Sequence, residues 1–287
     1  MFEVTVLGSS AAMPTVERNL PAIAVRRDGD IFLLDCGEGT QRQMMRFGLS
    51  FMKVKAIFIS HLHLDHFLGV FGMLKTMGLN ERKDELVIYA PQGSAGVFGK
   101  ESFLRVIEIK DGFSQDFGEF SVSAFSVKHA GECLGFSFEE KERRRFHEEK
   151  AKSLGIKGEL FSKISREGKL KIGKKSIKLS EVTYAVPGKK LVYTGDTSPC
   201  ASLEKAAKGA DLLISEATFA CDRKDEAAQN GHMTSEDAAK TAKKAKAKKL
   251  LLTHISGRYR DTSQLLAEAK EIFPETAVAH DGMKIPV

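Results

Sequence analysis

Three histidines and an aspartate fall within six positions, in the run His61-Leu62-His63-Leu64-Asp65-His66. Histidine is otherwise scarce, with eight in the 287 residues. Imidazoles with one carboxylate, and without thiolates, suit zinc or a similar transition metal, and catalytic sites of this kind keep a position open for chemistry. We interpret this run as a metal site, in preference to a chance cluster of polar loop residues.

The apolar residues 53–60 directly precede this run and should position it. Their β-branched and aromatic side chains are typical of a buried strand, so the run should lie on the loop at the carboxyl end of that strand. Side chains two residues apart in an extended backbone point the same way, so His61 and His63 can bind one ion. Asp65 and His66 lie past the bend, where they can reach a second ion or a bound water.

Further candidate ligands stand at the ends of other predicted strands. Apolar or alternating runs end near His129, Asp196, Glu216 and His254. Strand–turn–helix units recur on both sides of the histidine run, and such units gather strand-end residues along one rim of the sheets. His232 lies in a loop whose Thr234 or Ser235 can cap a helix predicted over residues 236–246. The pattern indicates an α/β fold with its site at one rim.

Composition limits the classes of protein that need consideration. With 42% hydrophobic residues the chain can bury a sizeable core, and we expect one domain over residues 1–287. The N-terminus lacks the pattern of a signal peptide, and no apolar stretch approaches the roughly 20 residues of a membrane span. Four scattered cysteines form no CxxC pair. We therefore expect a cytoplasmic protein with reduced thiols and no membrane partner.

One segment departs from the rest in charge. Residues 141–178 hold fourteen lysines and arginines against five glutamates, a local net charge of +9, whereas the whole chain carries +6. Glycines break this segment into short pieces, and we interpret residues 141–188 as an inserted basic arm. It is either a solvated charged face or an electrostatic platform for a phosphate backbone. The side chains expected to bind substrate are Arg143, Arg144, Arg145, Lys152, Lys157, Lys163 and, outside the segment, Arg258.

These motifs resemble those of the metallo-β-lactamase fold superfamily and, within it, the tRNase Z family, over nearly the whole length. Asp35 looks like the first superfamily motif, residues 61–66 the second, and His129, Asp196 and His254 the third to fifth. Two features are more specific to tRNase Z. Ser215-Glu216-Ala217-Thr218 resembles its HEAT-type loop and His232-Met233-Thr234 its HST-type loop, while the basic segment resembles its tRNA-binding exosite. The resemblance implies an αββα sandwich of the metallo-β-lactamase fold with a protruding basic arm.

The same resemblance implies the activity. It is that of a zinc-dependent endoribonuclease that removes 3′ trailers from precursor tRNA, with a metal-activated hydroxide attacking the phosphate and a 3′-hydroxyl left on the tRNA. Two Zn²⁺ ions per subunit are implied, although Mn²⁺ would accept the same ligands. Family precedent also suggests a homodimer in which each arm serves the tRNA bound at the other subunit's site.

The resemblance assigns a role to each site residue. His61, His63 and His129 would bind one ion, Asp65, His66 and His254 the other, and Asp196 would bridge them. Asp65 would also act as general base. His232 would protonate the leaving oxygen, with Glu216 fixing its orientation.

Two other functions remain open at this point. A small-molecule phosphodiesterase or ester hydrolase of the same fold would not need the basic arm. A metal-free RNA-binding relative is the third possibility, and the complete ligand set argues against it. Val16 stands where the family's PxKxRN loop has lysine, so the position of cleavage relative to the CCA end also stays open.

Overall fold

The computed structural model describes residues 1–173 and 175–287, so Lys174, one of the lysines counted in the basic segment, lies outside the described residues. The chain divides into two compact units. Unit 1 comprises Met1–Glu139 and Lys189–Val287, and unit 2 comprises Glu140–Gly188.

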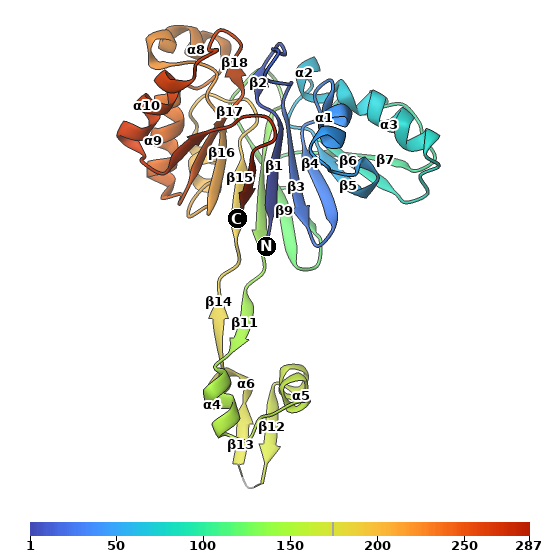
Figure 1. The fold of residues 1–287 in the computed structure, drawn as a ribbon, viewed down its shortest axis with the longest axis vertical. Coiled ribbons are helices and arrows are strands. Elements are labelled where there is room, and N and C mark those ends of the chain that lie inside the picture. Colours follow the sequence, from blue (N-terminus) through green and yellow to red (C-terminus); the bar gives the residue numbers. More distant parts are fainter. Residues whose placement is uncertain (174) are drawn as a thin grey trace. The chain divides into compact units, whose positions relative to one another are not determined.

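Unit 1 is built on two seven-stranded sheets that mix parallel and antiparallel neighbours (Figure 1). The first has the order β20 (Lys284–Pro286), β1 (Glu3–Gly8), β3 (Ala22–Arg27), β4 (Asp30–Leu34), β5 (Val54–Phe58), β6 (Leu86–Pro91) and β7 (Leu104–Ile109). The second has the order β19 (Thr276–Val278), β17 (Leu250–Thr253), β16 (Leu212–Glu216), β15 (Lys190–Tyr193), β10 (Leu134–Glu140), β9 (Phe120–Ser126) and β8 (Ser114–Asp116). Two short strands, β2 (Ser10–Ala11) and β18 (Ile255–Ser256), pair in parallel beside them.

Phenylalanines from both sheets form the core between them. Phe58 of β5 lies with its ring centroid 5.3 Å from that of Phe136 and 5.7 Å from that of Phe138, both on β10. Phe136 and Phe138 share a face because side chains alternate along a strand. Burying each such ring contributes about 2–3 kcal/mol, so this layer holds the two sheets together.

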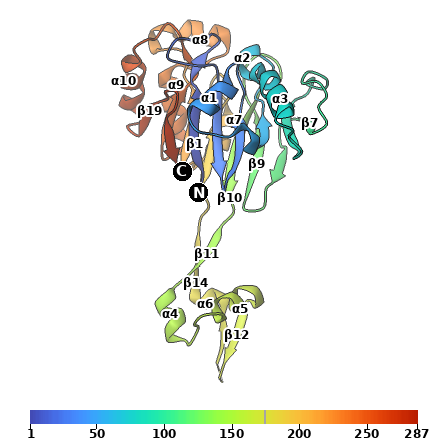
Figure 2. The ribbon, with the colours of Figure 1, turned by 45° about the vertical axis from the view of Figure 1, so that its right-hand side comes forward.

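Helices cover the outer face of each sheet, as Figure 2 shows for α1 (Thr40–Arg46) and α3 (Gly69–Leu79) on one side and α9 (Ser235–Ala245) and α10 (Ser263–Ile272) on the other. Met44 of α1 and Met73 of α3 pack with Ile57 of the first sheet, and Ala238 of α9 packs with Leu213 of the second. The helices of unit 1 are α1 (Thr40–Arg46), α2 (Leu64–Phe67), α3 (Gly69–Leu79), α7 (Ala201–Ala206), α8 (Lys224–Asn230), α9 (Ser235–Ala245) and α10 (Ser263–Ile272), with 3-10 turns at Phe51–Lys53 and Cys221–Arg223. The αββα sandwich expected from the sequence is confirmed. Among the described residues, no helix combines the length and the apolar character that crossing a bilayer requires.

The parallel parts of both sheets place the site. β4 and β5 are parallel neighbours, and so are β15, β16 and β17. Because parallel strands end at the same edge, the residues that follow β5, β15 and β17 and the last residue of β16 gather at one rim. These are the strand ends to which the sequence assigns ligands.

Unit 2 has a small apolar core of its own. Its strands are β11 (Arg143–Phe146), paired with β14 (Thr183–Val186), and β12 (Lys169–Ile172), paired with β13 (Lys175–Lys178). Its helices are α4 (Glu148–Ser153), α5 (Leu160–Glu167) and α6 (Leu179–Val182). Ala151, Ile156, Ile164, Leu170, Ile177 and Val182 are buried together. The segment therefore folds around these side chains although its surface is dominated by charge.

Candidate metal centre

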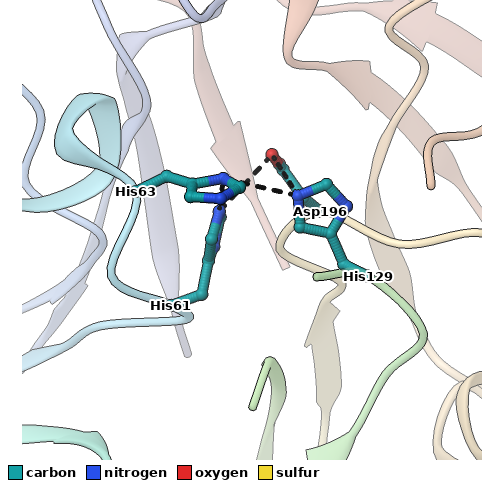
Figure 3. A group of neighbouring side chains, drawn as sticks. All are labelled: His61, His63, His129 and Asp196. Carbon is teal, nitrogen blue, oxygen red and sulfur yellow. Dashed lines mark hydrogen bonds and ion pairs between the residues drawn. The ribbon is translucent and has the colours of Figure 1, made fainter. Parts of the chain in front are cut away.

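The first group of ligand atoms comes from three strand ends (Figure 3). His61 and His63 lie on the loop after β5, His129 follows β9 and Asp196 follows β15. One atom from each lies within 4.8 Å of the others. His61 Nε2 is 2.9 Å from His63 Nδ1, and His129 Nε2 is 3.4 Å from the same His63 atom. The spacing of His61 and His63 thus brings both rings to one point.

A second group lies next to the first. Asp65 and His66 belong to α2 and His254 follows β17, with one atom from each again within 4.8 Å of the others. Asp196 faces both groups, because its Oδ2 is 3.3 Å from His66 Nε2 and its Oδ1 is 3.3 Å from His254 Nε2. The two groups therefore share one carboxylate.

Partners outside the two groups determine which ring nitrogen faces inward. His66 Nδ1 lies 2.8 Å from Asp35 Oδ2, and His129 Nδ1 lies 3.0 Å from the carbonyl of Gly231. Ser60 Oγ donates to Asp35 Oδ2, so it accepts from His61 Nδ1 at 3.0 Å. Each of these Nδ1 atoms is a donor, because a neutral imidazole has one N–H and the facing oxygen is an acceptor. The Nε2 lone pairs are left for the centre.

Asp35 is the buried anchor of this arrangement. Besides His66 it receives hydrogen bonds from Ser60 N at 2.7 Å and from the Tyr193 hydroxyl at 2.6 Å. Its φ of 58° lies in the left-handed region, which an aspartate tolerates better than most residues. The sequence predicts an orienting Asp35 at a tight turn, and the structure places it there.

The residues present fit a divalent metal. His66 Nε2, Asp196 Oδ1 and His254 Nε2 are buried and have no hydrogen-bond partner among the described residues, an arrangement that costs about 1–3 kcal/mol per group unless a cation is bound. Burial lowers the pKa of His61 to about 2, which keeps this ring neutral as a ligand must be. Burial also opposes protonation of His66, yet Asp196 and Asp35 raise its pKa well above the usual value. The carboxylates of the centre thus attract positive charge, whether a proton on His66 or a metal ion.

A carboxylate–imidazole pair stands beside the two groups. Glu216 is the last residue of β16, and its Oε1 accepts from His232 Nδ1 at 2.9 Å and from Thr197 N at 2.7 Å. The His232 ring lies with its centroid 4.8 Å from that of His129 and 5.5 Å from that of His254. Burial would lower the pKa of His232, but Glu216 raises it to about 9. His232 therefore favours its protonated form, and one of its ring atoms also lies within 4.8 Å of ligand atoms of Asp196 and His254.

The residues predicted to contact the substrate are divided between the two units, unlike the predicted metal ligands. Arg258 lies in unit 1, where its guanidinium makes two hydrogen bonds to Glu226, at 2.8 and 2.9 Å, and lies 5.1 Å from the Phe219 ring centroid. The remaining six are exposed residues of unit 2: Arg143, Arg144, Arg145, Lys152, Lys157 and Lys163. The structure thus brings together the seven predicted ligands, Glu216 and His232 in unit 1, whereas six of the seven predicted basic side chains belong to unit 2.

Comparison with known proteins assigns the family. A protein-family model described as Anti-Pycsar protein Apyc1 matches residues 2–270. Ribonuclease Z of Methanothermobacter thermautotrophicus is 43% identical over 298 residues, covering 100% of this chain and 97% of that relative. Ribonuclease Z of Archaeoglobus fulgidus is 43% identical over 300 residues, covering 100% and 98%. The chain belongs to the family of that model and to the ribonuclease Z family.

Solved structures agree with this assignment. Human tRNase Z, short form, superposes with a TM-score of 0.71 at 28% identity, covering 99% of both chains. The metallo-beta-lactamase fold protein YhfI from Bacillus subtilis gives a TM-score of 0.76 at 22% identity over 99% of this chain and 98% of that one, which shows the fold alone. The resemblance to tRNase Z that the motifs indicate is confirmed.

Sequence reasoning gave no role to several side chains of this ribonuclease Z site. Ser60 and Tyr193 bind Asp35, and Thr218 contacts both Glu216 and His254. Each carries a hydroxyl and lies within three residues of a predicted site residue. That proximity is the one signal that could have identified them.

Proposed function

We propose that this protein is a metal-dependent endoribonuclease that removes 3′ trailers from precursor tRNA. The observation that carries the proposal is the Glu216–His232 pair next to two groups of metal-ligand atoms. The curated ribonuclease Z relatives match the whole chain, and the superposed human protein is a tRNase Z.

We assign the ligands as the two groups divide them. His61, His63 and His129 would hold one ion, Asp65, His66 and His254 a second, and Asp196 would serve both. Nitrogen and oxygen donors without thiolates suit Zn²⁺, and Mn²⁺ would accept the same set. When bound, two such ions supply Lewis acidity that lowers the pKa of a water and neutralises charge at the phosphate.

Two side chains would handle protons in this mechanism. Asp65 Oδ2 is held by Ala12 N at 3.1 Å and its side chain is 15% exposed, so the carboxylate can accept a proton from an attacking water as general base. His232 commits its Nδ1–H to Glu216, which leaves Nε2 to donate a proton to the departing 3′-oxygen. Cleavage would leave a 3′-hydroxyl on the tRNA.

We propose that unit 2 is the tRNA-binding arm. Arg143, Arg144 and Arg145 follow one another on β11, and all three are exposed. A cluster of this kind binds a phosphate backbone without regard to sequence, in a manner that weakens as salt rises. Replacing the three by alanine should raise KM for precursor tRNA and leave hydrolysis of a small phosphodiester unchanged. Replacing the exposed Lys53, Lys55 and Lys110 of unit 1 provides a control of equal charge.

We further propose a homodimer in the cytoplasm. Met45, Leu64, Leu68 and Phe71 are exposed apolar side chains of α1, the α2–α3 region and α3, and Met45 and Leu68 line one hollow of about 430 Å³. A second copy of the chain is the occupant that would cover them, and Leu68→Glu should then yield monomers in sedimentation analysis.

The cysteines are all free, which suits a reducing compartment such as the cytoplasm.

The experiment that tests the activity is cleavage of a 3′-extended precursor tRNA by the purified protein, with and without zinc, beside a His63→Ala variant. Metal-dependent cutting near the acceptor end, lost in the variant, is the expected result, and the product length would locate the cut relative to CCA. Intact tRNA alongside turnover of a simple phosphodiester would instead identify a small-molecule hydrolase.

A further inference from the structure

The hydroxyl of Thr218 lies between a proposed metal ligand and the proposed catalytic pair. Its Oγ1 is 2.8 Å from Glu216 Oε2 and 2.9 Å from His254 Nδ1. All three residues are buried, with exposed fractions of 5% for Thr218, 1% for Glu216 and 4% for His254. Water therefore does not compete for these contacts, and one hydroxyl serves both neighbours.

The direction of both hydrogen bonds follows from counting protons. A hydroxyl has one proton to donate, and an ionised carboxylate can only accept. Two acceptor oxygens 2.8 Å apart would repel, so the Thr218 proton points at Glu216 Oε2. The remaining lone pair of Thr218 must then accept from His254, so His254 carries its proton on Nδ1.

This tautomer prepares His254 for a metal ion. With the proton on Nδ1, the lone pair is on Nε2, which is buried without a hydrogen-bond partner among the described residues. His254 Nε2 faces Asp196 Oδ1 at 3.3 Å and Asp65 Oδ2 at 3.6 Å. A lone pair facing two carboxylates is unfavourable unless a proton or a metal ion lies between them, and the neighbouring ligand atoms suit a metal ion.

The same hydroxyl helps to fix the rotation of the Glu216 carboxylate, together with Thr197 N, which donates to Oε1 at 2.7 Å. The contact of the hydroxyl with Oε2 at 2.8 Å is shorter than those from Met233 N at 3.2 Å and Thr218 N at 3.3 Å. With Oε2 held by Thr218 and Oε1 by Thr197 N, Oε1 faces His232 Nδ1, 2.9 Å away. Loss of the hydroxyl would loosen the carboxylate that orients His232.

We infer that Thr218 is a positioning residue whose single hydroxyl couples the metal ligand His254 to the Glu216–His232 pair. The half that concerns His232 rests on the proposed ribonuclease function. The half that concerns His254 depends only on metal binding. The coupling means that one substitution should weaken both functions of the site.

The test compares three variants at this position with a control elsewhere. Thr218→Val keeps the shape and removes the hydroxyl. Thr218→Ala and Thr218→Ser both lack the methyl group and differ from each other only in the hydroxyl, so they test the inference even if the valine variant does not fold. Thr241→Val on α9 removes an equally buried threonine hydroxyl, whose bond goes to the carbonyl of Asp237.

Two measurements are needed. Zinc affinity of the metal-free protein, by competition with a chromophoric chelator, should fall about 10–100-fold in the valine and alanine variants. At saturating zinc, kcat for precursor tRNA should also fall by at least tenfold with KM nearly unchanged. The serine and Thr241→Val variants should stay within a few-fold of the wild type in both measurements.

Other outcomes would overturn the inference. Unchanged zinc affinity in the hydroxyl-less variants would show that Thr218 does not hold His254, and a fall in only one measurement would exclude the coupling. A serine variant as impaired as the alanine variant would show that packing of the methyl group, and not the hydroxyl, matters. If the wild type cuts no precursor tRNA, the proposed function fails, while the zinc measurement still decides the half that concerns His254.

Discussion

The Tyr193 hydroxyl donates a 2.6 Å hydrogen bond to Asp35, a residue 158 positions away in the chain. Tyr193 ends β15 of the second sheet, and Asp35 directly follows β4 of the first. Asp35 also accepts a hydrogen bond from His66 Nδ1. The Tyr193–Asp35 hydrogen bond therefore links both sheets to one proposed metal ligand. The sandwich thus positions the candidate metal centre through a buried carboxylate as well as through the loops.

Replacing Asp35 by asparagine should weaken metal binding. Asparagine also tolerates the left-handed backbone, so the change removes the charge without straining the turn. The amide can no longer accept from Ser60, Tyr193 and His66 together. We expect zinc affinity to fall by about 10–100-fold in a chelator competition titration. The zinc affinity of Tyr193→Phe should fall by a smaller factor, because Ser60 and His66 still donate to Asp35. A larger loss of affinity in the phenylalanine variant than in the asparagine variant would contradict this account.

Removing His232 should affect turnover and not metal binding. We expect His232→Ala to lower kcat for precursor tRNA by about 10²–10⁴-fold, the usual contribution of general acid catalysis, while zinc stoichiometry stays that of the wild type. Glu216→Gln should lower kcat by a smaller factor, because the imidazole remains but loses its orienting charge. His280→Ala, at an exposed histidine, is the control. Loss of zinc from the His232 variant would make it a ligand instead.

The sequence predicts the helices and strands whose formation depends on residues close together in the chain. The run at residues 53–60 is apolar enough to be a strand, and β5 is found there at Val54–Phe58. Thr234 was one of two expected caps, and its Oγ1 accepts from Asp237 N at the start of α9. Local patterns of this kind need no knowledge of the partner elements.

Features that depend on distant partners were not predictable. The strand β7 (Leu104–Ile109) has mixed side chains, and it pairs with β6 by backbone hydrogen bonds that leave no pattern in the sequence. The contact between Thr218 and His254 joins residues 36 positions apart, so only the fold reveals it. In unit 2 the apolar core residues are scattered among many charged ones, so the sequence does not reveal that they pack together.

Two glycines of α3 should respond oppositely to alanine. A Cβ at Gly69 would lie 2.0 Å from the carbonyl oxygen of Gly37, which is backbone and cannot move aside, so Gly69→Ala should lower the free energy of unfolding by about 1–3 kcal/mol. At Gly78 the nearest atom would be 3.8 Å away, on the Phe103 ring. Gly78→Ala should therefore stabilise the protein by about 0.4–1 kcal/mol, through the lower entropy of the unfolded chain. Urea denaturation of both variants checks this, and equal effects would refute it.

Arg258 should bind substrate in competition with Glu226. Its guanidinium is held by both Glu226 oxygens, so a phosphate must replace that carboxylate to bind it. Arg258→Ala should raise KM for precursor tRNA several-fold and make the salt dependence of KM less steep, with little change in melting temperature. Glu226→Gln should lower KM or leave it unchanged. A rise in KM in the glutamine variant would instead show that Glu226 holds Arg258 in its binding position.

Asp211 should make stability depend on pH. Its carboxylate accepts from Lys189 Nζ, Lys190 N and Lys248 Nζ, and so joins the starts of three parallel strands, β15, β16 and β17. Burial would raise the pKa of Asp211, but the hydrogen bonds from Lys248 and Lys189 lower it below its usual 3.8.

A carboxyl whose pKa is lowered on folding stabilises the protein fully above its unfolded pKa, and this contribution is lost as pH falls through the folded pKa. Asp211→Asn should therefore cost about 1 kcal/mol at pH 7 and progressively less below pH 4. Urea denaturation of the metal-free protein from pH 7 to pH 3 isolates this effect from metal loss. A difference between variant and wild type that stays constant across this range would mean that the carboxylate contributes packing and not charge.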